Sequence, residues 1–270
     1  MTDNPLGRDS AYPDRYAPEL LYPIAREDAR APLGIAGQLP FRGADVWNAW
    51  ELTWLDDGGK PMVATATVSV PAESANIVES KSFKLYLNSF AQSRYRSPDA
   101  LRDVIARDIG RVAGASVQVS LAQPDAWRSR AVSALPGTLI DDLDCDGCAA
   151  DVDASLLATA GDRIVDDELH SHLLRSLCPV TGQPDTGSVS VRYRGPRIDP
   201  SSLLGYIVSF RRHNDFHEAC VERMFVDIKA RCDCETLTVH ARYNRRGGID
   251  INPFRTDTDA EPDNLRLWRQ

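Results

Sequence analysis

The sequence predicts an α+β protein built from two tandem copies of one unit, each an antiparallel sheet with a helix pair on one face. Two observations lead to this fold class. Residues 79–90 and 199–210 match each other without a gap, with Tyr86 and Tyr206, and Phe90 and Phe210, at equivalent positions. The flanking segments then repeat in the same order, with a strand pattern before and after each helix pair.

The first helix of each copy is predicted by an apolar stripe. Apolar side chains recur at i, i+3, i+4 and i+7 in both segments, which is the spacing of one face of an amphipathic helix. The stripe consists of Phe83, Tyr86, Leu87 and Phe90 in the first copy, and of Leu203, Tyr206, Ile207 and Phe210 in the second.

A second helix follows in each copy, beginning at Ser97-Pro98 in the first and ending near Ile228 in the second. Alternating patterns predict strands at 50–55, 65–70, 116–119, 188–193 and 237–240. The segment 50–55 has no evident counterpart in the second copy. A further helix is expected at residues 170–176. The predicted organisation is an N-terminal arm (1–31), a first module (32–150) and a second module (151–270).

Composition excludes several classes of protein. The chain has 270 residues, a net charge of −8 and 43% hydrophobic residues. It contains no run of about 20 apolar residues, and no signal peptide is evident at Met1, so a cytoplasmic protein is expected. The net negative charge argues against direct binding of nucleic acid.

Six cysteines are present, at positions 145, 148, 178, 220, 232 and 234. Free thiols are expected in a reducing compartment. The two close pairs could suggest a zinc site, but the spacing of Cys232 and Cys234 is tighter than that of usual zinc ligands. No metal is therefore predicted.

Cys178 is a candidate nucleophile, since a thiolate at the boundary of an element can be exposed. Residue type alone favours the alternative of a small buried side chain. Asp185 follows the turn-forming sequence Gly182-Gln183-Pro184, so the chain could fold back and bring this acid towards the thiol. An acid near a thiol can deliver a proton to whatever the thiol attacks.

His217 and Glu218 open the second helix of the second copy. An imidazole and a carboxylate together can bind the edge of a purine-like base. The alternative is a capping box formed by Asp215 and Glu218, with His217 in solvent. Glu79 offers a second carboxylate at a helix start, where the helix dipole alone would also favour it.

Ser80 and Lys81 begin a helix, where free N–H groups and a cation favour phosphate. Arg246 and Gly247 belong to a basic, glycine-containing turn, at 245–248. A solvated surface charge or a simple turn would explain both. Because the sequence lacks G-x-G-x-x-G, no Rossmann site is predicted. Each copy carries only some of these polar candidate residues, which suggests that the two copies together form one composite site.

Four ordered motifs, at residues 79–86, 178–185, 209–218 and 245–248, together resemble the NADPH-dependent 7-cyano-7-deazaguanine reductases. These are the nitrile reductases of queuosine biosynthesis, a tRNA modification. The resemblance extends from about residue 32 to residue 270 and implies two tandem tunnelling-fold (T-fold) modules.

The resemblance also implies roles for individual residues. It implies that Cys178 adds to the nitrile carbon to give a thioimide and that Asp185 donates a proton. The deazaguanine substrate would contact five residues: Val78, Glu79, Ser80, His217 and Glu218. The cofactor NADPH would contact four residues: Ser80, Lys81, Arg246 and Gly247. Covalent addition suits the substrate, because a free nitrile is a poor hydride acceptor.

The residues alone leave two other classes of function open. A cyclohydrolase of the same fold would hold zinc through Cys and His, and a non-catalytic base-binding protein would form no covalent adduct. A homodimer is expected, because tunnelling-fold modules usually close barrels by association.

Overall fold

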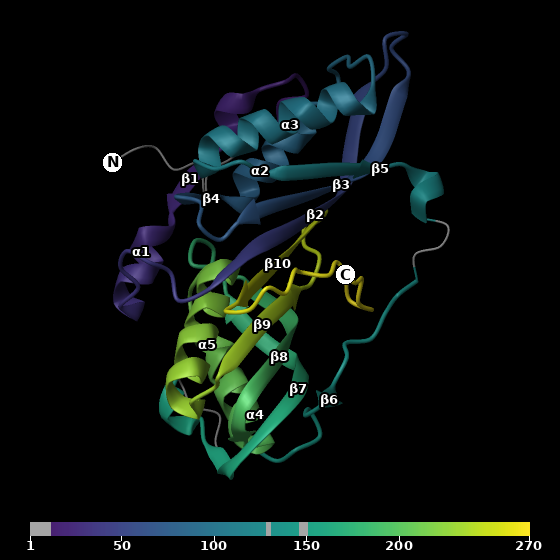
Figure 1. The fold of residues 1–270 in the computed structure, drawn as a ribbon. Coiled ribbons are helices and arrows are strands. Elements are labelled where there is room, and N and C mark those ends of the chain that lie inside the picture. Colours follow the sequence, from purple (N-terminus) through teal and green to yellow (C-terminus); the bar gives the residue numbers. More distant parts are fainter. Residues whose placement is uncertain (1–11, 128–130, 146–150) are drawn as a thin grey trace. The chain divides into compact units, whose positions relative to one another are not determined.

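A computed structural model describes residues 12–127, 131–145 and 151–270, which form two compact units (Figure 1). Of the described residues, the first unit comprises 12–29, 45–127, 131 and 245–251, and the second comprises 30–44, 132–145, 151–244 and 252–270. Helix α1 (Arg26–Arg30) and strands β2 (Arg42–Leu55) and β10 (Ile249–Thr256) have residues in both units. The architecture is mixed α+β, as predicted.

Three strands of the first unit run in the order β5-β3-β2, where β3 is Pro61–Pro71 and β5 is Gln118–Ala122. Helices α2 (Ser80–Asn88) and α3 (Pro98–Ala113) pack with these strands in one hydrophobic cluster, which contains the predicted stripe. Strands β1 (Pro23–Ala25) and β4 (Asn76–Val78) form a separate antiparallel pair. The short helices are η1 (Pro18–Leu20) and η3 (Pro124–Trp127).

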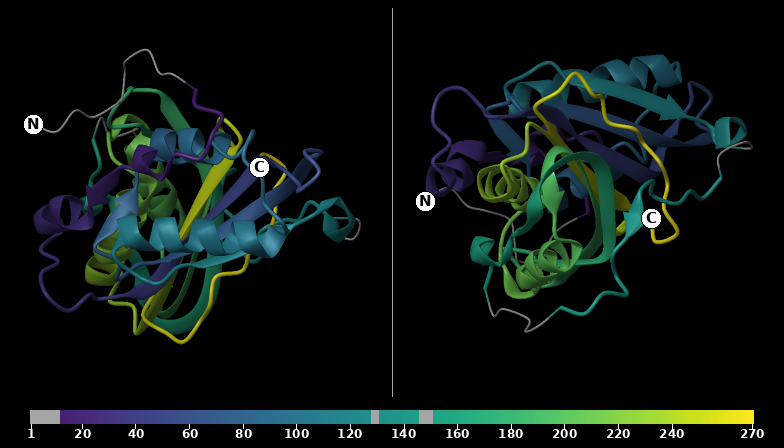
Figure 2. Two further views of the ribbon diagram at one scale, coloured as in Figure 1. Left: turned by 90° about the horizontal axis from the view of Figure 1, so that it is seen from above. Right: turned by 60° about the horizontal axis from the view of Figure 1, so that its bottom comes forward.

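In the second unit the strand order is β10-β9-β8-β7-β6, with helices α4 (Pro200–Ser209) and α5 (His217–Cys232) against the strands. Figure 2 shows this helix pair and its strands from two further directions. The long pair is β7 (Thr159–Leu177) and β8 (Pro184–Ile198), followed by β9 (Thr236–Tyr243). The remaining short elements are η2 (Ala31–Leu33), β6 (Thr138–Leu139), η4 (Ala154–Leu156) and η5 (Phe210–Arg212).

The duplication extends to individual hydrogen bonds. In the first unit Tyr86 on α2 donates its hydroxyl to Asp108 on α3, at 2.9 Å. In the second unit Tyr206 on α4 donates to Asp227 on α5, at 2.7 Å. The same tyrosine–aspartate bond therefore recurs at equivalent positions of the two helix pairs.

A short segment that precedes the strands of each copy also makes equivalent contacts with the first helix of that copy. The hydroxyl of Ser82 accepts from the backbone of Tyr22, and that of Ser202 accepts from the backbone of Ala158. Residues 16–22 thus contact the first helix pair of their unit as residues 153–158 contact theirs. The contacts place residues 12–29 within the first unit, while the module boundaries at 32 and 151 stay predictions.

The predicted helix at residues 170–176 is wrong, because these residues lie in strand β7. They pair antiparallel with β8, from His170 opposite Ser190 to Ser176 opposite Asp185. An irregularity between Ser171 and Leu174 interrupts the alternation that would have revealed a strand. Strand β7 accordingly supplies the second-copy strand that the sequence pattern did not locate.

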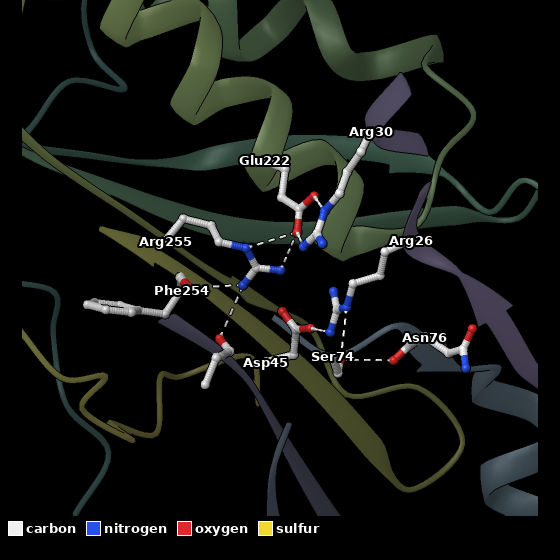
Figure 3. Close-up of polar contacts among 9 residues, drawn as sticks. Arg26, Arg30, Asp45, Ser74, Asn76, Glu222, Phe254 and Arg255 are labelled. Atoms are coloured by element: carbon white, nitrogen blue, oxygen red, sulfur yellow. Dashed lines mark hydrogen bonds and ion pairs between the residues drawn. The ribbon is translucent and has the colours of Figure 1, made fainter. Parts of the chain in front are cut away.

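Each unit buries an ion cluster (Figure 3). In the first unit Arg26 contacts Asp45 at 2.5 Å and donates Nε to Ser74. In the second unit Glu222 accepts from both Arg30 and Arg255. Such buried charges require partners, since an unpaired ion in a protein interior is costly. No described helix is long and apolar enough to cross a membrane.

Candidate active site

Cys178 follows strand β7 directly and begins the turn that leads into β8. Its N–H donates to the carbonyl of Gln183 at 2.9 Å, and its carbonyl accepts from Gly182 at 2.9 Å. Gly182 has φ of +67°, a conformation that favours glycine. Residue Cys178 is partly exposed. The turn therefore places Cys178 at the end of a hydrogen-bonded hairpin, in a partly exposed position that suits a nucleophile.

The second polar motif is held beside this turn by backbone bonds. Leu177 donates its N–H to the carbonyl of His213 at 2.8 Å, and Asp215 donates to the carbonyl of Leu177 at 3.2 Å. These bonds align residues 213–215 parallel to the end of β7. The start of α5 is thereby fixed next to the candidate nucleophile.

Asp185 lies on β8 opposite Ser176 and is buried, with 8% of its surface exposed. The chain does fold back as predicted, because the hairpin pairs Leu177 with Pro184. Oδ2 of Asp185 lies 3.2 Å from Nε2 of His217. The structure therefore brings two predicted site residues from different elements into direct contact.

His217 is the first residue of α5, and its imidazole is packed rather than solvated. Its ring stacks on Tyr243, with 3.8 Å between ring centroids and 16° between planes. Both ring nitrogens of His217 are buried, and neither has a hydrogen-bond partner among the residues that the structure describes, since the 3.2 Å approach of Nε2 to Asp185 is a close contact and not a hydrogen bond. A buried polar atom without a partner is unfavourable, and a bound polar ligand would satisfy it.

The capping box considered for Asp215 and Glu218 is wrong. The helix begins one residue later, with Phe216 as the N-cap and no side-chain cap bond, while Asp215 accepts from the N–H of Phe216. Glu218 is instead buried in the first turn of α5, where the helix dipole favours an anion. The acid at this position therefore does not serve as a cap.

Cys220 and Ser176 are buried next to the phenol of Tyr243. Burial raises the pKa of the Cys220 thiol, so this cysteine stays protonated. Burial likewise raises the pKa of Cys232 to about 11 and that of Cys234 to about 12. Because a protonated thiol is a poor nucleophile, these three cysteines are less suited to covalent chemistry than the partly exposed Cys178.

The first unit contains the other predicted residues. Glu79 is the N-cap of α2 and is 3% exposed, and its carboxylate accepts from the N–H groups of Lys81 and Ser82 at 2.8 and 2.6 Å. The capping role favours the structural alternative for Glu79. Val78 is buried at the end of β4, while Ser80 and Lys81 are half-buried at the start of α2.

Arg246 and Gly247 lie in the tight turn that precedes β10. The N–H of Arg246 donates to the carbonyl of Ile249, and Gly247 and Gly248 have φ of +60° and +78°. Two successive positive φ values are typical of a type I′ hairpin turn, which explains the glycine pair. A Cβ at Gly247 would lie 3.2 Å from the side chain of Lys84. This position therefore has little room for a side chain.

These residues fit a dinucleotide phosphate in part. Lys81 and Arg246 supply cations, and Ser80 supplies a hydroxyl. The N–H groups of Lys81 and Ser82 already donate to Glu79, so anion binding here would depend on side chains more than on the helix N-terminus. The fit is consistent with a phosphate-bearing cofactor.

Sequence patterns did not identify Tyr243 or Ser176 as neighbours of the site. Tyr243 continues the alternation of Val239 and Ala241 on β9, so it was indistinguishable from an ordinary core residue. Groups of three or more potential metal ligands are not found among the described residues, and Cys148 lies outside them.

Comparison with known proteins gives two family matches. Residues 12–121 match the family described as nitrile reductase, 7-cyano-7-deazaguanine-reductase N-term, and residues 184–262 match the family described as QueF-like protein. The apo crystal structure of the archaeosine synthase QueF-Like covers 38% of this chain and 99% of its own, at 19% identity and a TM-score of 0.31. That likeness is too weak to carry an argument.

Relatives that match over nearly their full length are much more similar to this chain in sequence. The NADPH-dependent 7-cyano-7-deazaguanine reductase of Burkholderia vietnamiensis is 55% identical, over 99% of this chain and 98% of that protein. The proteins of the same name from Burkholderia multivorans and Paraburkholderia xenovorans are 54% and 53% identical over the same shares. The chain belongs to the 7-cyano-7-deazaguanine reductase family.

Proposed function

We propose that this protein catalyses the NADPH-dependent reduction of 7-cyano-7-deazaguanine to 7-aminomethyl-7-deazaguanine, a step of queuosine biosynthesis in the cytoplasm. The observation that carries the proposal is the partly exposed Cys178, at the end of a hairpin that also holds Asp185 against His217. Addition to a nitrile requires a nucleophile for the carbon and a proton donor for the nitrogen, and this hairpin carries a residue of each kind. The relatives that bear this activity in their names cover nearly the whole chain.

In the proposed first step, Sγ of Cys178 adds to the nitrile carbon and a C–S bond forms. The nitrile π bond breaks, and Asp185 supplies the proton that the nitrogen takes up, giving a thioimide. NADPH, which Ser80, Lys81, Arg246 and Gly247 would hold, would supply the two hydrides that this carbon takes up, and the thiolate of Cys178 would leave between the two reductions. With one proton for each hydride, the nitrile becomes a primary amine and two NADPH are oxidised.

His217 and Glu218 are proposed to hold the deazaguanine base. The buried Nδ1 of His217 supports this role, because it has no partner among the described residues. Glu218 places a buried carboxylate one residue further along α5. A carboxylate accepts from the N–H groups that such a base presents.

Val78, Glu79 and Ser80 are proposed as further substrate contacts in the first unit. Glu79 already accepts hydrogen bonds from two backbone N–H groups, so it would use the remaining lone pairs of its carboxylate to accept from the substrate. Ser80, Lys81, Arg246 and Gly247 are proposed to bind NADPH. Lys81 and Arg246 would neutralise the phosphate charge through charge-assisted hydrogen bonds, which are stronger than hydrogen bonds between neutral groups.

Residues 32–150 and 151–270 are proposed to be two T-fold modules that follow an N-terminal arm, and the protein is proposed to be a homodimer. The repeated order of strands and helices, and the repeated tyrosine–aspartate bond, support two modules of one kind. Sedimentation equilibrium would test the dimer, for which the expected mass is twice that of the 29.8 kDa chain.

The direct test of the function is NADPH oxidation with the nitrile base as substrate. Two NADPH oxidised per amine formed are expected, with no turnover by a Cys178→Ala variant. Stoichiometric zinc together with hydrolysis of a pterin or purine would indicate a cyclohydrolase instead. Binding of the nitrile base without turnover or adduct would indicate a non-catalytic binding protein.

A further inference from the structure

Tyr243 occupies a fixed position against the imidazole of His217. The two rings are nearly parallel, with centroids 3.8 Å apart. The imidazole also lies against Asp185, whose Oδ2 is 3.2 Å from Nε2. A ring held between an aromatic face and a carboxylate can neither tilt nor slide without losing one of these contacts.

Tyr243 is buried at the end of β9. Its residue is 1% exposed, and its carbonyl accepts from Nε2 of Gln270 at 3.1 Å. The phenol is buried beside Ser176 and Cys220, and burial raises its pKa well above the usual value. The hydroxyl therefore stays protonated, and the described contact of this side chain with His217 is made by the ring.

We propose that Tyr243 is a positioning residue, whose ring holds the imidazole of His217 in the orientation that places Nε2 on Asp185. This inference rests on the proposed function, because His217 and Asp185 are assigned there to the substrate and to proton donation. Orientation matters in such a pair, since a displacement of about 1 Å can lower a reaction rate by about a hundredfold.

Two substitutions separate the ring from the hydroxyl. Tyr243→Phe keeps the stacked ring, so a rate of nitrile reduction within about threefold of the parent is expected. Tyr243→Leu removes the ring, and a loss of about tenfold or more in kcat is expected. Equal losses in both variants would overturn the proposal, because the hydroxyl and not the ring would then be responsible.

A matched control measures the effect of losing any buried ring from this sheet. Tyr193 on β8 is also 1% exposed, and its hydroxyl accepts from the backbone of Ile198, away from His217. Tyr193→Leu is expected to lower thermal stability as Tyr243→Leu does, but to leave kcat within about threefold of the parent. An equal fall in kcat in both leucine variants would show a general packing effect and refute the proposal.

A double-mutant cycle tests whether Tyr243 acts through His217. Tyr243→Leu is expected to slow the parent about tenfold or more, but to have almost no further effect in a His217→Ala background. Equal effects in the two backgrounds would contradict a positioning role.

Proton NMR gives a readout that does not depend on activity. The stacked ring of Tyr243 is expected to shift the ring protons of His217 upfield, and this shift should persist in Tyr243→Phe and disappear in Tyr243→Leu. An unchanged shift in Tyr243→Leu would overturn the inference even if the parent reduced the nitrile. A parent that shows the stack but reduces no nitrile would instead refute the proposed function.

Discussion

Replacement of Glu222 by alanine would remove the carboxylate that two buried guanidinium groups share in the second unit. Arg30 donates Nε to Oε2 and a terminal nitrogen to Oε1, at 2.8 and 2.7 Å. Arg255 donates Nε and a terminal nitrogen to Oε1, at 3.1 and 2.8 Å. Glu222 and Arg255 are 2% and 0% exposed, so water could not readily replace the lost acceptor.

The expected cost follows from the uncompensated charge. Breaking a buried ion pair by removing one partner costs about 3–5 kcal/mol. For a chain of this size each kcal/mol corresponds to roughly 2–4 °C in Tm, so Glu222→Ala should melt about 6–20 °C below the parent. The ring of Phe41 packs against both guanidinium groups and would not replace the missing anion.

The matched control is Glu235→Ala, which breaks an exposed pair in the same unit. Glu235 contacts Arg194 at 2.7 Å, and the two side chains are about half exposed. Exposed pairs contribute about 0–1 kcal/mol, so a small change in stability is expected. Urea unfolding and thermal melts followed by circular dichroism would compare the two variants. If Glu222→Ala lost no more stability than Glu235→Ala, the reasoning about the buried cluster would be refuted.

Three smaller changes test other parts of the structure. Ser97 caps α3 by accepting from the N–H of Ala100, so Ser97→Ala should cost about 1 kcal/mol in urea unfolding, and Ser97→Asp should restore it. Gly248 has φ of +78°, so Gly248→Ala should cost about 1–2 kcal/mol, and an unchanged midpoint would count against the turn described here. Burial, with the charges of Arg242 and Arg255, holds the pKa of His240 well below its usual 6.5. The unfolded chain therefore binds more protons below pH 6.5, and stability should fall as the pH falls from 7 to 5. A His240→Gln variant should show a shallower fall in Tm over this range.

The sequence predicted α2, α3 and α4 well because these helices carry a clear apolar period and a clear start, whereas the helix predicted at residues 170–176 was wrong. The stripe from Phe83 to Phe90 locates α2, which ends two residues earlier at Asn88, and the cap at Ser97 locates the start of α3. The first predicted helix of the second copy likewise corresponds to α4, with Pro200 in its first turn.

Strand β7 could not be found in this way. Its irregularity between Ser171 and Leu174 leaves Leu173 exposed and Leu174 buried, so the local pattern has no period of two. Pairing with β8 determines its conformation, and that pairing is a tertiary property. The same limit applies to the site, where the contact of Asp185 with His217 depends on how β8 and α5 pack, and neither spacing nor residue type encodes it.

The central claim is that Cys178 attacks a nitrile carbon, and intact-mass spectrometry tests it most directly. The protein would be incubated with 7-cyano-7-deazaguanine in the absence of NADPH and then denatured without reductant. We expect a mass increase equal to that of the whole nitrile base, located by peptide mapping on Cys178 and absent from Cys178→Ala. An unmodified protein that nevertheless reduces the nitrile, or an adduct that persists in Cys178→Ala, would contradict this account.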